Sequence, residues 1–160
     1  HLAREAEVQP IYVSVGLAWE GAERAALATI APVLHGRVRP LVSLELTMRD
    51  VYPASHWAIR GTPPAYDTPD EDVYLAGRNI VLLSKAAVFC AGAGIHRLAI
   101  GPLAGNPFPD ATPAFFEAMA HAMSLGLAHE IEVLAPFADL DPSFTPGASS
   151  SRPRSPTCCC

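Results

Sequence analysis

The sharpest chemical pattern in the sequence is the tripeptide Gly77-Arg78-Asn79, which opens a strongly apolar run. A glycine lets the backbone come close to an anion, and an arginine offers a fork of charged N–H donors. The first turn of a helix adds backbone N–H groups that have no partner within the helix. Together these groups are typical of a phosphate site. The tripeptide alone also fits an ordinary helix that starts at a glycine and carries a solvated arginine.

Three loops are expected to surround such a site. In open α/β sheets, ligands bind beyond the carboxyl ends of the strands, where loops converge. That rule selects residues 15–17 after the first predicted strand, the irregular stretch 47–76 after the second, and residues 101–110 after the third. Long loops in compact domains are often functional, so the stretch 47–76 is a candidate binding segment.

Polar residues in the stretch 47–76 allow two interpretations each. His56, beside Trp57, could place an imidazole and an aromatic face over a base, whereas a surface turn anchored by Trp57 explains the same residues. The acidic residues of the stretch could hold magnesium, although a solvated acidic run is the simpler explanation. These acidic residues are Asp67, Asp70, Glu71 and Asp72.

The elements that must position these residues alternate between strand and helix. Strands are predicted at 9–15, 38–46, 96–100 and 131–134, and helices at 19–34, 77–93 and 113–125. Gly36 and Gly126 are predicted to end helices, and Thr112-Pro113 is predicted to start one. This alternation predicts an α/β fold with a parallel sheet covered on both faces and right-handed crossovers.

Apolar side chains mark the expected core. The helix 113–125 carries one apolar face, made of Phe115, Phe116, Met119, Ala122 and Met123. Cys90 lies in an apolar run and is expected to be a small core residue rather than a nucleophile. The adjacent Cys158, Cys159 and Cys160 lack the spacing that lets two thiolates reach one zinc ion. No metal site is predicted.

Composition favours small-molecule chemistry in one globular domain. The chain has 160 residues, of which 50% are hydrophobic and 17% charged, enough to bury a core. Its net charge of -5 provides no basic field to attract nucleic acid or anionic lipid. The longest apolar stretch, 80–95, is interrupted and shorter than the roughly 20 residues that span a bilayer, so no membrane partner is expected. No signal-peptide pattern is present, so the expected location is the cytoplasm.

A longer pattern extends the tripeptide. The run from Leu75 to Ala87 is followed by a strand ending at Gly101 and then by Phe108-Pro109-Asp110. This order resembles the 7-cyano-7-deazaguanine synthases (the ExsB/QueC family), which belong to the PP-loop, or adenine nucleotide alpha hydrolase, superfamily. Their hallmark is Pro-Gly-Arg-Asn opening an apolar helix, a strand ending in glycine, and then Tyr-Pro-Asp-Cys-Arg-Pro-Glu-Phe. The resemblance covers about residues 1–135.

The resemblance implies a fold and a chemistry. The implied fold has three α/β/α layers with a mostly parallel sheet, Rossmann-like and of the PP-loop ATPase type. These relatives adenylate a carboxylate on a deazaguanine base, release pyrophosphate, and let ammonia attack the activated acyl group. ATP and Mg²⁺ are therefore expected, the expected partner is a nucleobase-like small molecule, and a homodimer is one assembly open to the chain.

The resemblance also assigns two sets of residues. Those expected to bind the nucleotide are Gly16, Gly77, Arg78, Asn79 and Gly101. Those expected to bind the base-like substrate are Phe108, Asp110 and His56, with Asp110 accepting hydrogen bonds from the base.

Three departures from the family pattern qualify these expectations. The Ser-Gly-Gly-x-Asp-Ser loop that wraps pyrophosphate is absent and would lie, with the first strand, just upstream of His1, so no unaided ATP turnover is expected. Asp110 is followed by Ala111-Thr112-Pro113-Ala114 where the relatives have Cys-Arg-Pro-Glu, which is expected to change what the loop binds. The relatives' four-cysteine zinc cluster is also absent. Residues 1–138 are expected to form a partial nucleotide-binding domain, and 139–160 a disordered tail rich in Ser, Pro and Arg.

Two other functions stay open. A non-catalytic nucleotide-binding module of the same architecture would bind ATP without releasing pyrophosphate. A gene remnant would have no activity, and the tail does resemble translation in a wrong frame. The sequence does not identify the substrate or the nucleophile.

Overall fold

The computed structural model describes residues 7–33, 37–65 and 67–140. Its strands are β1 (Ile11–Ser14), β2 (Val42–Glu45), β3 (Arg97–Ala99) and β4 (Glu132–Leu134). Its α-helices are α1 (Glu20–Ile30), α2 (Trp57–Arg60), α3 (Asp70–Val73), α4 (Arg78–Gly92) and α5 (Pro113–Leu127). Two short 3-10 helices are η2 (Ala31–Val33) and η3 (Pro109–Ala111).

The strands form two parallel pairs. β1 pairs with β2, with Ile11 opposite Val42, and β3 pairs with β4, with Leu98 opposite Val133. The predicted α/β class and the parallel pairing are therefore confirmed. Among the described residues the two pairs form separate sheets, so a single sheet at the centre of three layers is not shown.

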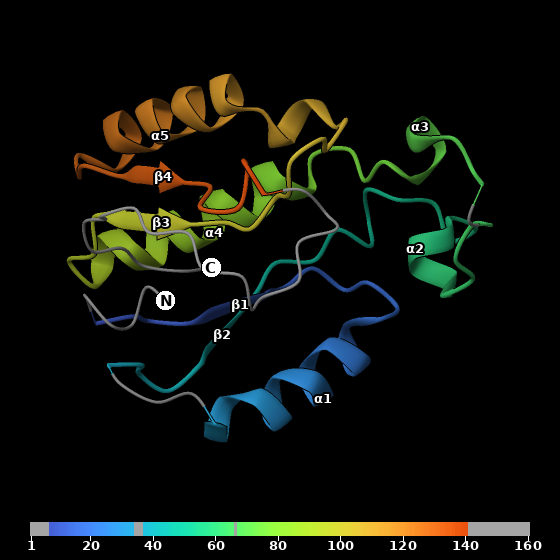
Figure 1. The fold of residues 1–160 in the computed structure, drawn as a ribbon, viewed down its shortest axis with the longest axis horizontal. Helices are drawn as coiled ribbons and strands as arrows, with labels where there is room; N and C mark the ends of the chain where they lie inside the picture. Colours follow the sequence, from blue (N-terminus) through green and yellow to red (C-terminus); the bar gives the residue numbers. More distant parts are fainter. Residues whose placement is uncertain (1–6, 34–36, 66, 141–160) are drawn as a thin grey trace.

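Packing, rather than backbone hydrogen bonding, joins the two pairs. α4 contacts both β1 and β3, and α5 packs on α4 and β4. Figure 1 shows α5 above the β3–β4 pair and α1 below the β1–β2 pair. The shared core contains Ile11, Leu83, Ala86, Ala87, Cys90, Leu98, Phe116, Met123 and Ile131. Cys90 is 1% exposed, which confirms its prediction as a core residue.

The start of α5 follows the prediction and its end does not. Thr112 caps the helix, because its Oγ1 accepts a hydrogen bond from Phe115 N at 3.2 Å, and Pro113 is the first helical residue. Gly126 was predicted to end the helix, but it lies inside α5, and Ala128 takes the left-handed conformation instead (φ 48°). The physical reason is Ser124, which bonds with both the N–H and the carbonyl of Ile131 and so fixes where the chain turns back.

The apolar face of α5 is smaller than predicted. Phe116 and Met123 are buried, and Phe115 and Met119 pack beside them. Ala122 is exposed, so its place on the buried face was wrong. Two long side chains with their partly buried neighbours are enough to cover the β4 side of the core.

The stretch 47–76 has a small core of its own. It was predicted as an irregular excursion, and its regular elements are indeed only the short helices α2 and α3. The lack of sustained periodicity in this stretch also predicts that it is not a core element. That prediction was wrong, because Met48, Tyr52, Ala58 and Leu75 are buried together with Val15 and Leu17. This second cluster fixes the stretch against the loop that follows β1.

Some expectations fall outside the described residues. One is the segment 1–6, whose sequence resembles the last turns of a helix. The others are the end of the predicted helix 19–34, at Leu34 and Gly36, and the tail from residue 141 onward. The described body itself runs to Leu140, whose carbonyl accepts a hydrogen bond from Ala104 N at 3.1 Å. Over the ranges that the structure describes, none of the helices has both the length and the apolar character needed to cross a bilayer.

The cap of α5 can be tested directly. Thr112→Ala removes the side-chain oxygen that Phe115 N uses, and loss of such a cap costs about 1 kcal/mol of unfolding free energy. In a chain of this size that corresponds to a fall of about 2 to 4 °C in the melting temperature. Calorimetry or urea unfolding measures it. Thr112→Ser keeps the oxygen and should stay near wild type, and equal losses in both variants would show that the cap is not the cause.

Candidate functional site

A cavity of about 300 Å³ lies where the start of α4, the stretch 47–76 and the loop 101–110 meet. Four of the residues predicted to act at a site line it: Arg78, Asn79, Phe108 and Asp110. The remaining lining residues are Trp19, Trp57, Val73, Tyr74, Leu75 and Asn106. The structure therefore brings together half of the predicted site residues, from two segments that are distant in sequence.

Asp110 and Asn79 hold the two segments together. Asn79 N donates to Asp110 Oδ2 at 3.2 Å, and Asn79 Nδ2 donates to the Asp110 carbonyl oxygen at 2.9 Å. Asp110 is only 5% exposed, so its carboxylate depends on such donors. The position also suits a negative charge, because the N-terminus of α4 carries the positive end of the helix dipole. The helix terminus that was predicted to bind a phosphate thus already receives a carboxylate.

The turn before α4 is fixed by backbone bonds. Gly77 is in the left-handed region (φ 78°), and a Cβ there would meet nothing within 4 Å, so backbone conformation is what requires a glycine. Arg78 N donates to the Leu75 carbonyl at 3.0 Å, and the Tyr52 hydroxyl donates to the Ala76 carbonyl at 3.0 Å. Burial raises the pKa of Tyr52, so it remains a neutral donor at physiological pH.

Arg78 reaches from α4 toward α1. Its Nη2 lies 3.9 Å from Glu23 Oε1, and its guanidinium lies 5.8 Å from the centre of the Trp19 ring. The side chain is 34% exposed, so this ion pair contributes little to stability. Glu23 also accepts from the Tyr12 hydroxyl at 2.9 Å, and burial together with this bond raises the pKa of Tyr12 to about 12. Among the described residues, Arg78 is the one cationic residue that lines the cavity.

Two stacked aromatic pairs line the cavity. Trp19 stacks on Trp57 with ring centres 5.3 Å apart and planes 14° apart. Tyr74 stacks on Phe108 with ring centres 5.1 Å apart and planes 25° apart. Trp19 and Tyr74 were not predicted from the sequence to be site residues. The available signal was composition, since the chain has only two tryptophans and both lie here.

His56 supports the cavity from outside its lining. Its Nδ1 accepts from Ala58 N at 3.2 Å and so caps α2. Its ring stacks on Tyr52, with centres 4.8 Å apart, and on Trp57, with centres 5.7 Å apart. These contacts favour the interpretation of a turn anchored by Trp57. Direct contact between His56 and a substrate stays a prediction.

The loop at Gly16 binds an internal carboxylate. Glu20 Oε1 accepts from the backbone N–H groups of Val15, Gly16 and Leu17 at 2.8, 2.8 and 3.0 Å. Burial alone would raise the pKa of Glu20, but hydrogen bonds from Ser14 and these N–H groups outweigh it and lower the pKa. Since Glu20 occupies this anion-binding loop, close approach of a nucleotide at Gly16 stays a prediction.

The glycines at 16 and 101 have structural explanations. At Gly16 φ is 86°, and a Cβ would lie 2.8 Å from Arg49 Cγ. At Gly101 a Cβ would lie 3.4 Å from the Phe137 ring, which packs against it. Neither residue lines the cavity, and neither does Gly77. Their predicted contacts with a nucleotide are untested by this arrangement.

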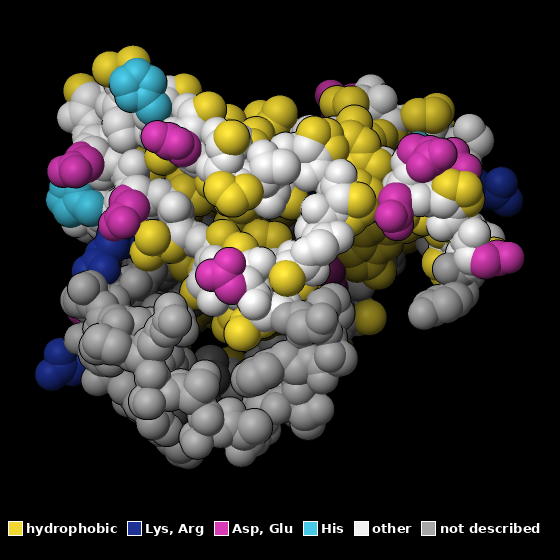
Figure 2. All heavy atoms as spheres, turned by 45° about the horizontal axis from the view of Figure 1, so that its top comes forward, with side chains coloured by type: hydrophobic (Ala, Val, Ile, Leu, Met, Phe, Trp, Pro, Cys, Tyr) yellow, Lys and Arg dark blue, Asp and Glu magenta, His cyan; other side chains and the backbone are white. Residues whose placement is uncertain are grey.

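The acidic run of the stretch 47–76 is exposed. Asp67, Asp70, Glu71 and Asp72 lie on the surface, and Figure 2 shows acidic side chains gathered over this part of the molecule, at the right. Within the described ranges, no group of three His, Cys, Asp or Glu side chains could hold a metal ion. The arrangement favours the interpretation of a solvated acidic run.

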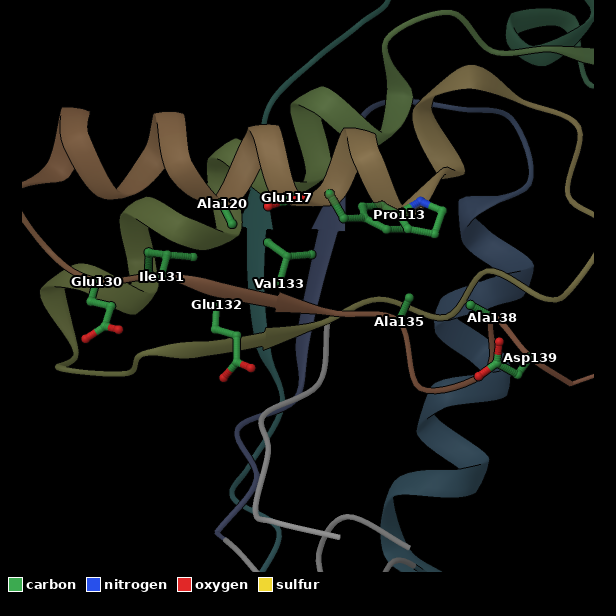
Figure 3. Close-up of a pocket in the computed structure, with 11 residues that line it drawn as sticks. Pro113, Glu117, Ala120, Glu130, Ile131, Glu132, Val133, Ala135, Ala138 and Asp139 are labelled. Carbon is green, nitrogen blue, oxygen red and sulfur yellow. The ribbon is translucent and has the colours of Figure 1, made fainter. Parts of the chain in front are cut away.

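A second cavity, of about 800 Å³, lies between α5 and β4 (Figure 3). Of the residues that the structure describes, four acids line it and no lysine or arginine does. These acids are Glu117, Glu130, Glu132 and Asp139. Such a lining repels phosphate and carboxylate groups, so the smaller aromatic cavity is the candidate site.

Comparison with known proteins finds a family model and a curated relative that this chain resembles. The family model described as "QueC: Queuosine biosynthesis protein QueC" matches residues 61–150, which include the start of α4 and the loop that carries Asp110. A curated relative, 7-cyano-7-deazaguanine synthase 1 of Desulfitobacterium hafniense (strain Y51), is 28% identical over 141 residues. The match covers 86% of this chain and 62% of that relative, so the chain spans less than two thirds of the relative's length.

The role of Glu20 predicts a pH dependence. A carboxyl group whose pKa is lower in the folded than in the unfolded chain contributes stability above the unfolded pKa and loses it as the pH falls through the folded pKa. We therefore expect part of the unfolding free energy of the wild type to disappear as the pH falls below about 4.5, the usual value for a glutamate. Glu20→Gln should be destabilised by about 2 kcal/mol at neutral pH and should lack this component.

Urea unfolding of both proteins between about pH 6 and about pH 3 measures this difference. Glu71→Gln, a matched change at an exposed site, should stay within about 0.5 kcal/mol of wild type. If Glu20→Gln and wild type lost stability in parallel as the pH falls, the hydrogen bonds from the loop would not be what lowers the Glu20 pKa.

Proposed function

The chain belongs to the QueC family of queuosine biosynthesis proteins, and on this premise we propose that it contributes the substrate cavity of an ATP-dependent, 7-cyano-7-deazaguanine synthase-like enzyme. The observation that carries the proposal is the meeting of Arg78, Asn79, Phe108 and Asp110 at one aromatic cavity. The chain spans 62% of the curated relative, so the activity proposed is that of the whole protein.

In the proposed reaction, a carboxylate oxygen of 7-carboxy-7-deazaguanine attacks the α-phosphorus of ATP, and pyrophosphate leaves. Ammonia then attacks the acyl carbon, and AMP leaves to give the amide. The amide oxygen then attacks the α-phosphorus of a second ATP, and pyrophosphate leaves. Loss of AMP, which carries away that oxygen, and of the two amide protons gives the nitrile. Each attack is favoured when the acyl group and the phosphate are held together in one site.

The cavity suits the base of this substrate. A volume of about 300 Å³ is at the lower end for ligand sites, which fits one base rather than a base and a triphosphate together. Phe108 and Tyr74 offer aromatic surface for a planar ring. Asp110, whose carboxylate is an acceptor only, suits the N–H groups along the edge of a guanine-like base.

Arg78 suits the place where the carboxylate and the phosphate meet. Its guanidinium is partly exposed, and no other cationic residue within the described ranges lines the cavity. A fixed positive charge lowers the cost of bringing a carboxylate close to a phosphate. Gly77 and Asn79 set the direction of Arg78 by fixing the start of α4.

Magnesium is proposed to arrive with ATP. The described residues provide no cluster of ligands for a metal ion of their own, and Mg²⁺ commonly binds through substrate phosphates. The metal would neutralise phosphate charge there.

The proposal also includes the fold. In it, the two strand pairs join into one sheet of the PP-loop type with three layers.

The test of this proposal is pyrophosphate release by the full-length protein supplied with ATP, ammonia and 7-carboxy-7-deazaguanine. Asp110→Asn should lower kcat/KM by about 30-fold, which corresponds to losing about 2 kcal/mol from a hydrogen bond to a charged group. Asp139→Asn is the matched control, because Asp139 lines the other cavity, and it should leave the rate unchanged. Pyrophosphate release that is independent of the base, or unaffected by Asp110→Asn, would contradict the proposal.

A further inference from the structure

Two buried donors beside the cavity have no hydrogen-bond partner. They are Trp57 Nε1 and Arg78 Nε, and no described atom accepts from either. Leaving a buried donor unpaired costs about 1 to 3 kcal/mol, and native proteins contain few such groups. Both residues line the aromatic cavity. The cavity is therefore chemically incomplete on this side.

The two donors gather around one indole ring. Trp57 stacks on Trp19, and the Arg78 guanidinium lies over the Trp19 ring. The Trp19 and Trp57 segments are also tied by a backbone bond, from Ala18 N to the Ala58 carbonyl at 2.9 Å. The two indoles and the guanidinium therefore form one unit, which we call the tryptophan wall (Trp19, Trp57 and Arg78).

The tryptophan wall lies outside both strand pairs. Trp57 begins α2, a helix of four residues that is followed by Gly61 in the left-handed conformation (φ 77°). Figure 1 shows α2 at the right, away from both strand pairs. Both unpaired atoms are buried, so a ligand would contact them only after side chains of the wall move.

The chemistry of the cavity defines what such a ligand must offer. Trp Nε1 and Arg Nε can only donate, so their partner must be an acceptor. Asp110, which lines the same cavity, can only accept when ionised, so the same ligand also needs N–H groups. The Tyr74–Phe108 pair and the indoles favour a flat ring. A planar heteroaromatic carboxylate with N–H donors meets all three requirements.

We propose that Trp57 is a specificity-determining residue, whose indole N–H, together with Arg78 Nε, binds the carboxylate of a planar heteroaromatic ligand in this cavity. The inference rests on the proposed function for the identity of that ligand. It adds a recognition role for the tryptophan wall, in which the two unpaired donors gain partners when the ligand binds. Trp57 thereby distinguishes the carboxylate from the same ring without it.

The two tryptophans serve as intrinsic probes of ligand binding at the tryptophan wall. They are the only tryptophans in the chain, so tryptophan fluorescence and the indole N–H signals in a ¹H–¹⁵N spectrum both report on this wall. The probes are 7-carboxy-7-deazaguanine and 7-deazaguanine, which lacks the carboxylate. With the wild type we expect the carboxylate to quench fluorescence, to move the Trp57 indole signal and to bind at least tenfold more tightly in calorimetry.

Trp57→Phe keeps an aromatic ring and removes the N–H. It should weaken binding of the carboxylate by about tenfold, the effect of one hydrogen bond, and leave 7-deazaguanine within about threefold of wild type. Glu71→Gln, a change at an exposed site outside the tryptophan wall and the cavity lining, is the control, and it should preserve the discrimination between the two probes. A purely structural role for Trp57 would weaken both probes equally and would overturn the inference.

The wild-type measurements keep the test decisive if Trp57→Phe does not fold. Carboxylate binding seen by calorimetry without any change in the Trp57 indole signal overturns the inference and leaves the proposed function standing. Discrimination through Trp57 without ATP-dependent pyrophosphate release supports the tryptophan wall and contradicts the proposed function. Absence of binding by either probe overturns both.

Discussion

The site depends on the double hydrogen bond between Asn79 and Asp110. It joins the first turn of α4 to the loop before α5 and so places Phe108 beside Tyr74 and Arg78 beside the same cavity. The bond is favoured because Asp110 is buried and sits at the positive end of a helix dipole. One of the two bonds uses the Asp110 carboxylate, and Asp110 also lines the cavity.

Internal carboxylates accept from backbone N–H groups at two of the places predicted to bind a ligand. Glu20 fills the loop after β1, and Asp110 accepts from the first turn of α4. A phosphate at either position would have to displace a carboxylate or lie beside it. Among the described residues that line the cavity, Arg78 is the cationic one and Asp110 the acidic one.

The rim loops are held by a scaffold that relies on side-chain packing. α4 contacts both strand pairs, and its buried residues Leu83 and Cys90 belong to the cluster that joins Ile11 of β1 to Leu98 of β3. The loop after β1 and the stretch 47–76 share a second cluster around Met48 and Tyr52. Because each cluster combines residues from several segments of the chain, the position of the cavity wall follows from the packing of these clusters.

The sequence by itself determined the local elements and the motif. The turn at Gly77, the cap at Thr112 and the apolar spacing of α4 depend on neighbours within a few residues, and so they could be predicted. Only the tertiary structure decided which distant groups meet. Trp19 stacks on Trp57, Tyr52 donates a hydrogen bond to Ala76, and Asn79 bonds with Asp110. These outcomes depend on hydrogen bonds and stacking between segments, which composition and spacing do not encode.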